Sequence, residues 1–111
     1  MYYPSSFRMA SVKWRIDFNA DLIDNYMIKH GDRVLGYTDK EQTLVVIDPR
    51  CSMERQKEVL FHEICHAAFE AVVSSKDIPS EEELVSNGSP LILQALYSSK
   101  KIRRFLFDDE F

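Results

Sequence analysis

Glycine and proline are scarce in this sequence, with three and four residues among 111. This scarcity makes long flexible linkers improbable, and the length leaves room for one modest hydrophobic core. Hydrophobic residues make up 45% of the chain and charged residues 29%, the ordinary composition of a globular domain. We therefore expect a single domain over residues 1–111.

Long apolar runs are also missing. No stretch approaches the roughly 18 residues that a membrane span needs. Residues 1–10 lack the basic start and apolar stretch of a signal peptide, so we expect a cytoplasmic protein. Cysteine is limited to Cys51 and Cys65. In a cytoplasmic chain we expect both thiols to be reduced and structural.

The net charge of −4 gives no indication of a nucleic-acid partner, and we expect neither nucleic acid nor membrane to bind. The oligomeric state stays open. One local exception is a basic group followed by an acidic one: Lys100, Lys101, Arg103 and Arg104, then Asp108, Asp109 and Glu110. We interpret this C-terminal segment as solvated and charge-paired, with docking to an acidic partner as the alternative.

The first half of the chain predicts mainly strands. Residues 12–18 alternate apolar and charged side chains, the period-2 pattern of a half-buried strand. Residues 19–29 are ambiguous but have helical spacing, and Gly31 follows them as a stop signal. Residues 33–38 and 43–47 flank a turn-forming stretch, which indicates an antiparallel hairpin. Residues 44–47 are apolar on both faces, as in a strand covered on both sides or lining a cleft.

The second half predicts two helices. Ser52 can cap a helix over residues 53–73. Ser80 opens another and forms a capping box with Glu83. This second helix runs towards Ser98 unless Asn87-Gly88 ends it or Pro90 kinks it. We therefore predict the α+β class, with a small antiparallel or mixed sheet packed on both helices.

Residues 62–66 read His-Glu-Ile-Cys-His, the HExxH pattern, within the helix expected over residues 53–73. Residues four apart lie one above the other on a helix, so both imidazoles can reach one metal ion. Zinc favours nitrogen ligands and keeps an open position in hydrolytic sites. Glu63 projects about 100° around the helix from His62, where it can accept a proton from the activated water. We expect one zinc ion per chain, held by His62 and His66, with Glu63 as the general base.

The apolar residues of this helix spread around most of its circumference, which is typical of a helix at the centre of its domain. They are Leu60, Phe61, Ile64, Ala67, Ala68 and Ala71. The two histidines then lie on the face that can open onto a cleft. If the HExxH pattern had arisen by chance, two histidines would lie on an otherwise apolar helix without an interaction partner. We therefore favour the metal site.

Zinc needs a third protein ligand. Glu70 continues the histidine spacing, but eight residues of helix rise about 12 Å from His62, too far to share one ion. The downstream candidates lie together at the start of the second helix: Glu81, Glu82 and Glu83. The alternative is that these acids are solvated and favoured there by the helix dipole. The capping box would occupy Glu83.

We choose Glu82 as the third metal ligand. One continuous helix face runs from it through Val85, Ser89 and Ile92, with a small residue where two helices could approach. A similar face runs from Glu81 through Leu84, Gly88 and Leu91. Glu81 and Glu83 therefore stay open as alternatives.

Three segments together resemble a known family. They are GYTD at 36–39, TLVVIDP at 43–49 and LFHEICHA at 60–67. They look like the ImmA/IrrE-type metallopeptidases, and more closely like their minimal single-domain relatives, the minigluzincins, many of them phage-encoded. The resemblance covers Gly36 to Leu96. Residues 87–90, Asn-Gly-Ser-Pro, depart from the small apolar residues usual in the family.

This resemblance implies a zincin-like fold, in which a small sheet packs on the HExxH helix and a following helix supplies a glutamate ligand. It implies that an edge strand above the metal pairs with extended substrates, which maps onto Leu44–Ile47. It also raises the possibility that residues 105–111 keep the enzyme latent by lying in the cleft. The alternative for that segment is ordinary packing.

Our leading hypothesis is a zinc-dependent endopeptidase acting on a peptide or protein substrate, with water as the nucleophile. Tyr26 or Tyr37 could donate a hydrogen bond to the oxyanion, and core packing is the alternative for each. The rival hypothesis is a catalytically silent, zinc-stabilised binding or regulatory module.

Overall fold

The structure, a computed structural model, describes residues 3–73 and 79–108, which form four strands and four helices. The strands are β1 (Ser6–Met9), β2 (Val12–Phe18), β3 (Gly36–Asp39) and β4 (Leu44–Ile47). The helices are α1 (Ala20–His30), α2 (Met53–Val73), α3 (Glu81–Ser98) and α4 (Lys100–Phe107). The sheet order is β1-β2-β4-β3, with β2 and β4 parallel and the other neighbours antiparallel. The α+β class with a mixed sheet is confirmed.

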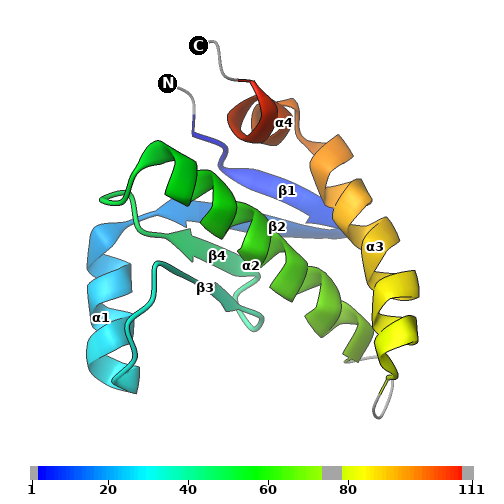
Figure 1. Cartoon of the computed structure of the whole chain (residues 1–111), viewed down its shortest axis with the longest axis horizontal. Helices are drawn as coiled ribbons and strands as arrows, with labels where there is room; N and C mark the ends of the chain where they lie inside the picture. The colour runs from blue at the N-terminus through cyan, green and yellow to red at the C-terminus, as the bar shows by residue number, and fades with distance from the viewer. Residues whose placement is uncertain (1–2, 74–78, 109–111) are drawn as a thin grey trace.

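Helices cover the sheet unequally on its two faces (Figure 1). On one face α2 lies across the strands, and its Leu60 and Ile64 join Val45 and Ile47 of β4 in the main core. On the other face α1 covers only part of the sheet, where Ile23 packs in a smaller cluster with two β4 side chains. Because β4 contributes to both clusters, all four of its residues are buried.

Local capping explains where the helices begin and end. The Asn19 side chain accepts a hydrogen bond from the Leu22 amide, and Gly31 ends α1 in the left-handed conformation at φ 77°. Ser52 Oγ accepts from the Arg55 amide at the start of α2. The predicted helix over residues 53–73 is confirmed.

Helix α3 keeps the predicted capping box and continues through Pro90 to Ser98. It approaches α2 closely at Gly88, where an added Cβ would lie 2.6 Å from the Phe69 ring. Asn87-Gly88 does not end the helix. Gly88 instead has no side chain, and this lets α3 approach α2 closely. Among the described residues, no helix combines the length and apolar character that crossing a bilayer requires.

The β1–β2 hairpin escaped prediction because its turn lacks the usual signal. Ala10 and Ser11 both adopt positive φ, at 52° and 65°, as in the tight hairpin turns that glycine and asparagine favour. The outer edge of β1 is closed by α3. Gln94 Oε1 accepts from the Ala10 amide, and Ser98 Oγ accepts from the Arg8 amide over 2.8 Å.

The expectation that Leu44–Ile47 forms the edge strand is wrong. This strand, β4, pairs with β2 on one side and β3 on the other, so it has no open edge. The physical reason is the parallel pairing of β2 with β4, which places the second strand of the β3–β4 hairpin inside the sheet. The open edge is β3, Gly36–Asp39.

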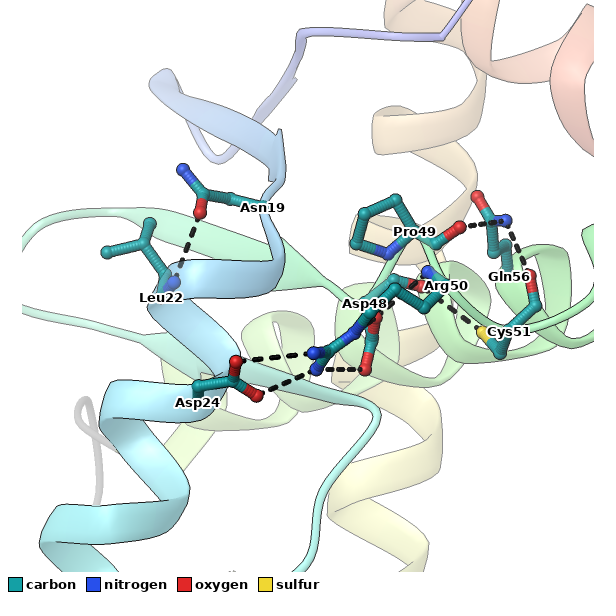
Figure 2. A network of polar contacts seen from close by, with 8 residues as sticks. All are labelled: Asn19, Leu22, Asp24, Asp48, Pro49, Arg50, Cys51 and Gln56. Atoms are coloured by element: carbon teal, nitrogen blue, oxygen red, sulfur yellow. Dashed lines mark hydrogen bonds and ion pairs between the residues drawn. The ribbon is translucent and has the colours of Figure 1, made fainter.

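A network of polar contacts fixes the connection from β4 to α2 (Figure 2). The Arg50 guanidinium donates to Asp48 over 2.9 Å and to Asp24 of α1 over 2.8 Å. Gln56, in the first turn of α2, donates to two carbonyls of the connection over 3.2 and 2.8 Å. The network holds the start of α2 against α1 and the end of β4. It therefore sets the position of the helix that carries the histidines.

The C-terminal segment contains a packed helix, which the sequence did not predict. It forms α4, which buries Ile102 and Phe105 in the main core, while Lys100, Lys101 and Arg104 are exposed. Residues 109–111 lie outside the described residues. Among the described residues of this segment, the expected charge pairing is represented by Arg104 with Asp108, 3.9 Å apart.

Candidate metal centre

The side chains of His62 and His66 converge on one point. They lie one turn apart on α2, and their Nε2 atoms are 2.9 Å from each other. The two rings stand nearly perpendicular, with centroids 4.5 Å apart and an interplanar angle of 80°. Both side chains are exposed on the helix face that the sequence assigned to the cleft.

This geometry suits a metal ion with two nitrogen ligands. Two zinc–nitrogen bonds of about 2.0–2.1 Å at a tetrahedral angle hold the nitrogens about 3.3 Å apart. The observed separation needs only a small outward rotation of the rings to reach that value. The two Nε2 atoms lie within hydrogen-bond distance of each other. The two residues therefore fit the group that the motif predicts.

Glu63 is held against the open edge of the sheet. Its side chain is only 6% exposed, and its Oε1 accepts a hydrogen bond from Thr38 Oγ1 over 2.9 Å. The close approach depends on Gly36, because an added Cβ there would lie 3.3 Å from Glu63 Cγ and 2.5 Å from a Val59 methyl. Strand β3 therefore positions the carboxylate that lies between the two histidines in sequence.

A cleft of about 350 Å³ brings these residues together on the protein surface. It is lined by Tyr26, Val34, Gly36, Tyr37, Thr38, His62, Glu63, His66 and Glu70. It continues along β3 in both directions, towards Arg55 and Glu58 on one side and towards α1 on the other. The result is a groove that follows the outer side of the open edge strand.

Both candidate oxyanion donors lie in this cleft. The rings of Tyr26 and Tyr37 stack with centroids 4.3 Å apart and an interplanar angle of 13°. Burial, with smaller contributions from Asp39 and Asp17, raises the pKa of Tyr37 above its usual value of 10.0. At neutral pH the Tyr37 hydroxyl therefore keeps its proton and can act as a hydrogen-bond donor.

The structure does not bring a third ligand to the histidines. Among residues 3–73 and 79–108, no three His, Cys, Asp or Glu side chains are grouped closely enough to hold a metal ion. Glu82 is exposed in the first turn of α3, where Ser86 Oγ lies 3.4 Å from its Oε1. Glu83 takes part in the capping box.

The packing argument for Glu82 is wrong, although the ligand assignment itself stays a prediction. Val85, on the Glu82 face, is 52% exposed, and Ser89 is exposed too. The closest approach of α3 to α2 is at the buried Gly88, and Leu91 of the same face packs against the main core, as does Ile92 of the Glu82 face. Gly88 lies on the Glu81 face, one helical position away from the one chosen.

Sequence reasoning assigned no role at the site to two residues of the GYTD segment, although that segment carries part of the family resemblance. Thr38 and Gly36 carry no metal-ligand or general-base signal, and they contact Glu63 only because β3 lies beside α2.

The described part of the proposed latency segment lies outside the cleft. Residues 105–108 do not line the cleft, and Phe105 instead packs against Phe18 with ring centroids 5.6 Å apart. The part of the proposed latency segment beyond residue 108 lies outside the described residues. Cys51 and Cys65 are both free.

Comparisons with protein-family models, with curated proteins and with solved structures found no match to this chain. The functional argument therefore depends on the chain's own residues.

Proposed function

We propose that this protein is a zinc-dependent endopeptidase in which Glu63 acts as general base. The observation that carries the proposal is the convergence of the His62 and His66 Nε2 atoms, 2.9 Å apart, beside Glu63 in a surface cleft. A bound zinc ion would supply a polarised scissile carbonyl and a water of lowered pKa. The third ligand in this proposal is Glu82, with Glu81 and Glu83 as alternatives.

The two edges of the sheet support a peptide as the substrate. The edge of β1 is closed, because Gln94 and Ser98 accept from its outward amides. The edge of β3 is open and borders the cleft that contains His62 and Glu63. An extended peptide can add to such an edge through main-chain hydrogen bonds, which are independent of its sequence. The substrate would then lie along β3 with a peptide bond beside Glu63.

The position of Glu63 fits proton transfer better than metal ligation. Its carboxylate is anchored by the Thr38 hydroxyl and is largely shielded from bulk water. An anchored carboxylate loses little freedom when it accepts a proton from water and delivers it to the leaving amine. The residues also fit the proposed membership of the ImmA/IrrE-type metallopeptidases, whose HExxH glutamate has this role.

One observation favours a second candidate, a zinc-stabilised binding module. The same Thr38 bond that anchors Glu63 could serve only to tie α2 to β3, in which case the carboxylate is structural. A structural role predicts that the loss of Glu63 lowers stability and changes no activity.

Cleavage of an unfolded casein by the zinc-loaded protein separates the two candidates. We expect fragments from the wild type and from Glu54→Gln, a matched change at an exposed residue of the same helix. We expect Glu63→Gln to lose about 100-fold or more in rate while it retains zinc. Equal inactivity of the wild type and Glu63→Gln on casein and on a mixed peptide library would leave the binding module as the better account.

A further inference from the structure

Charge is unevenly distributed along this chain. Residues 1–16 and residues 84–107 contain no Asp or Glu, yet they hold half of the 14 Lys and Arg residues. These are Arg8, Lys13, Arg15, Lys100, Lys101, Arg103 and Arg104. The rest of the chain carries all 18 acidic residues. The net charge of −4 therefore conceals a basic part and a strongly acidic part.

The fold brings the two acid-free segments together. The Arg8 amide donates to Ser98 Oγ over 2.8 Å, and Ala10 bonds Gln94 on the same helix. The rings of Tyr3 and Phe105 lie 5.7 Å apart, which joins the N-terminal segment to α4. Figure 1 shows α4 and the end of α3 beside β1. We use the name basic surface for five exposed cations of this region. Arg8, Lys13 and Arg15 project from the sheet face away from α2, and Lys100 and Lys101 begin α4, just after the Ser98 that bonds the Arg8 amide.

These five cations are not neutralised within the described part of the chain, because none of them takes part in an ion pair there. The other two basic residues of the segments are already engaged. Arg103 donates to the carbonyls of Leu96 and Tyr97, and Arg104 lies 3.9 Å from Asp108. Within residues 3–73 and 79–108, no acidic side chain therefore competes with an outside partner for these five cations.

The arrangement on the sheet is unfavourable for stability. Arg8 lies directly opposite Lys13 across the β1–β2 pair, and Arg15 projects from the same face two residues further on. Like charges in opposed positions of an antiparallel pair repel one another. Basic residues on strands often serve to block an open edge, but the edge of β1 is already closed by α3. Edge protection therefore does not explain these cations.

We propose that the basic surface docks a short acidic segment of a protein partner. Tyr97, three residues before Lys100, is 74% exposed, and its ring suits a peptide that carries apolar as well as acidic residues. A nucleic acid fits less well, because its phosphates continue beyond the basic surface and meet the acidic part of the molecule. A short acidic segment can instead end where the cations end.

The test measures binding of a fluorescently labelled oligo-glutamate peptide to the full-length protein by anisotropy. We expect saturable binding at low ionic strength that weakens as salt is added. The variant Lys13→Thr/Arg15→Thr should bind about tenfold more weakly, since two exposed charge contacts are lost. The matched control Lys29→Thr/Arg33→Thr removes the same charge from exposed positions elsewhere and should change affinity by about twofold or less.

A second pair, Lys100→Ser/Lys101→Ser on α4, repeats the test on a different element, and thermal melting checks that each variant is folded. Equal affinity of both test pairs and the control would overturn the proposal, because net charge alone would then explain binding. Tighter binding of single-stranded DNA than of oligo-glutamate, lost in the same variants, would overturn it in favour of a nucleic acid. Binding is measured without cleavage, so its failure leaves the proposed peptidase activity untouched.

Discussion

The Thr38 hydroxyl donates a hydrogen bond to the Glu63 carboxylate over 2.9 Å, and it also lies 3.2 Å from the Glu63 carbonyl. One side chain of the open edge strand thus holds both the backbone and the carboxylate of the central HExxH residue. Thr38 therefore connects β3, the strand proposed to receive the substrate, to Glu63, the proposed general base. Displacement of β3 changes the position of the carboxylate.

Replacement of Thr38 tests this link. Thr38→Val keeps the shape of the side chain but removes the donor, so Glu63 loses its anchor while both histidines remain. We expect casein cleavage to fall about tenfold, with zinc affinity changed by about twofold or less and the free energy of unfolding lowered by about 1 kcal/mol. Thr38→Ser retains the donor and should behave nearly as wild type. Full activity of Thr38→Val would show that the anchor has no catalytic importance.

Gly36 is the contact point between β3 and α2. In Gly36→Ala the new methyl group would meet Val59 Cγ1 at 2.5 Å and the Val46 carbonyl at 3.0 Å, so the strand must move away from the helix. We expect a loss of about 1–3 kcal/mol in denaturant unfolding, together with slower cleavage. Gly31→Ala is the comparison, because its φ of 77° is strained for alanine but its surroundings are open. It should cost about 1–2 kcal/mol and leave cleavage by the folded protein unchanged.

The HExxH helix was predictable from sequence because its signals are local. Ser52 caps it, apolar residues recur along it, and the histidine spacing fixes their common face. The pairing of strands was not local. The Ala10–Ser11 turn has no glycine or asparagine, and the parallel pairing of β2 with β4 joins segments that are far apart in sequence. For that reason β1 was missed and the edge was assigned to the wrong strand of a correctly predicted hairpin.

The third ligand was difficult for a related reason. Two adjacent faces of α3 each carry a glutamate, apolar residues and a small residue, so periodicity alone cannot choose between them. The contact of Gly88 with the Phe69 ring shows which face of α3 packs on α2, and that contact exists only in the folded chain. The role of Thr38 could not be predicted either, because its contact with Glu63 depends on the packing of β3 beside α2.

The Asp48–Arg50 contact predicts how stability depends on pH. Hydrogen bonds from the Arg50 side chain hold the pKa of Asp48 below its usual value of 3.8. A carboxylate whose pKa is lower in the folded state stabilises the fold above the unfolded pKa, and this contribution is lost as the pH falls through the folded pKa. Asp48→Asn should cost about 1–3 kcal/mol at pH 7.

The difference between wild type and Asp48→Asn should narrow as the pH falls below about 4 in denaturant titrations. Asp32→Asn serves as the control, since Asp32 is exposed in the connection after α1. It should match the wild type at every pH. A constant difference between wild type and Asp48→Asn across this range would mean that charge on Asp48 is not what stabilises the connection.

Alanine substitution of each acid at the start of α3 identifies the third zinc ligand. We expect Glu82→Ala to weaken zinc binding about 100-fold or more in competition with a chelator, and Glu81→Ala to change it little. Glu83→Ala should instead lower the free energy of unfolding by about 1 kcal/mol through loss of the capping box. If the large loss of zinc affinity falls on Glu81→Ala, the α3 face that packs against α2 supplies the ligand.

The zinc content of the protein, measured by native mass spectrometry, tests the central claim most directly. The account predicts one zinc ion per wild-type chain and per Glu63→Gln chain, and none at equal zinc concentration in His62→Ala or His66→Ala. Wild-type protein that binds no zinc, or histidine variants that bind it as well as wild type, would contradict the account.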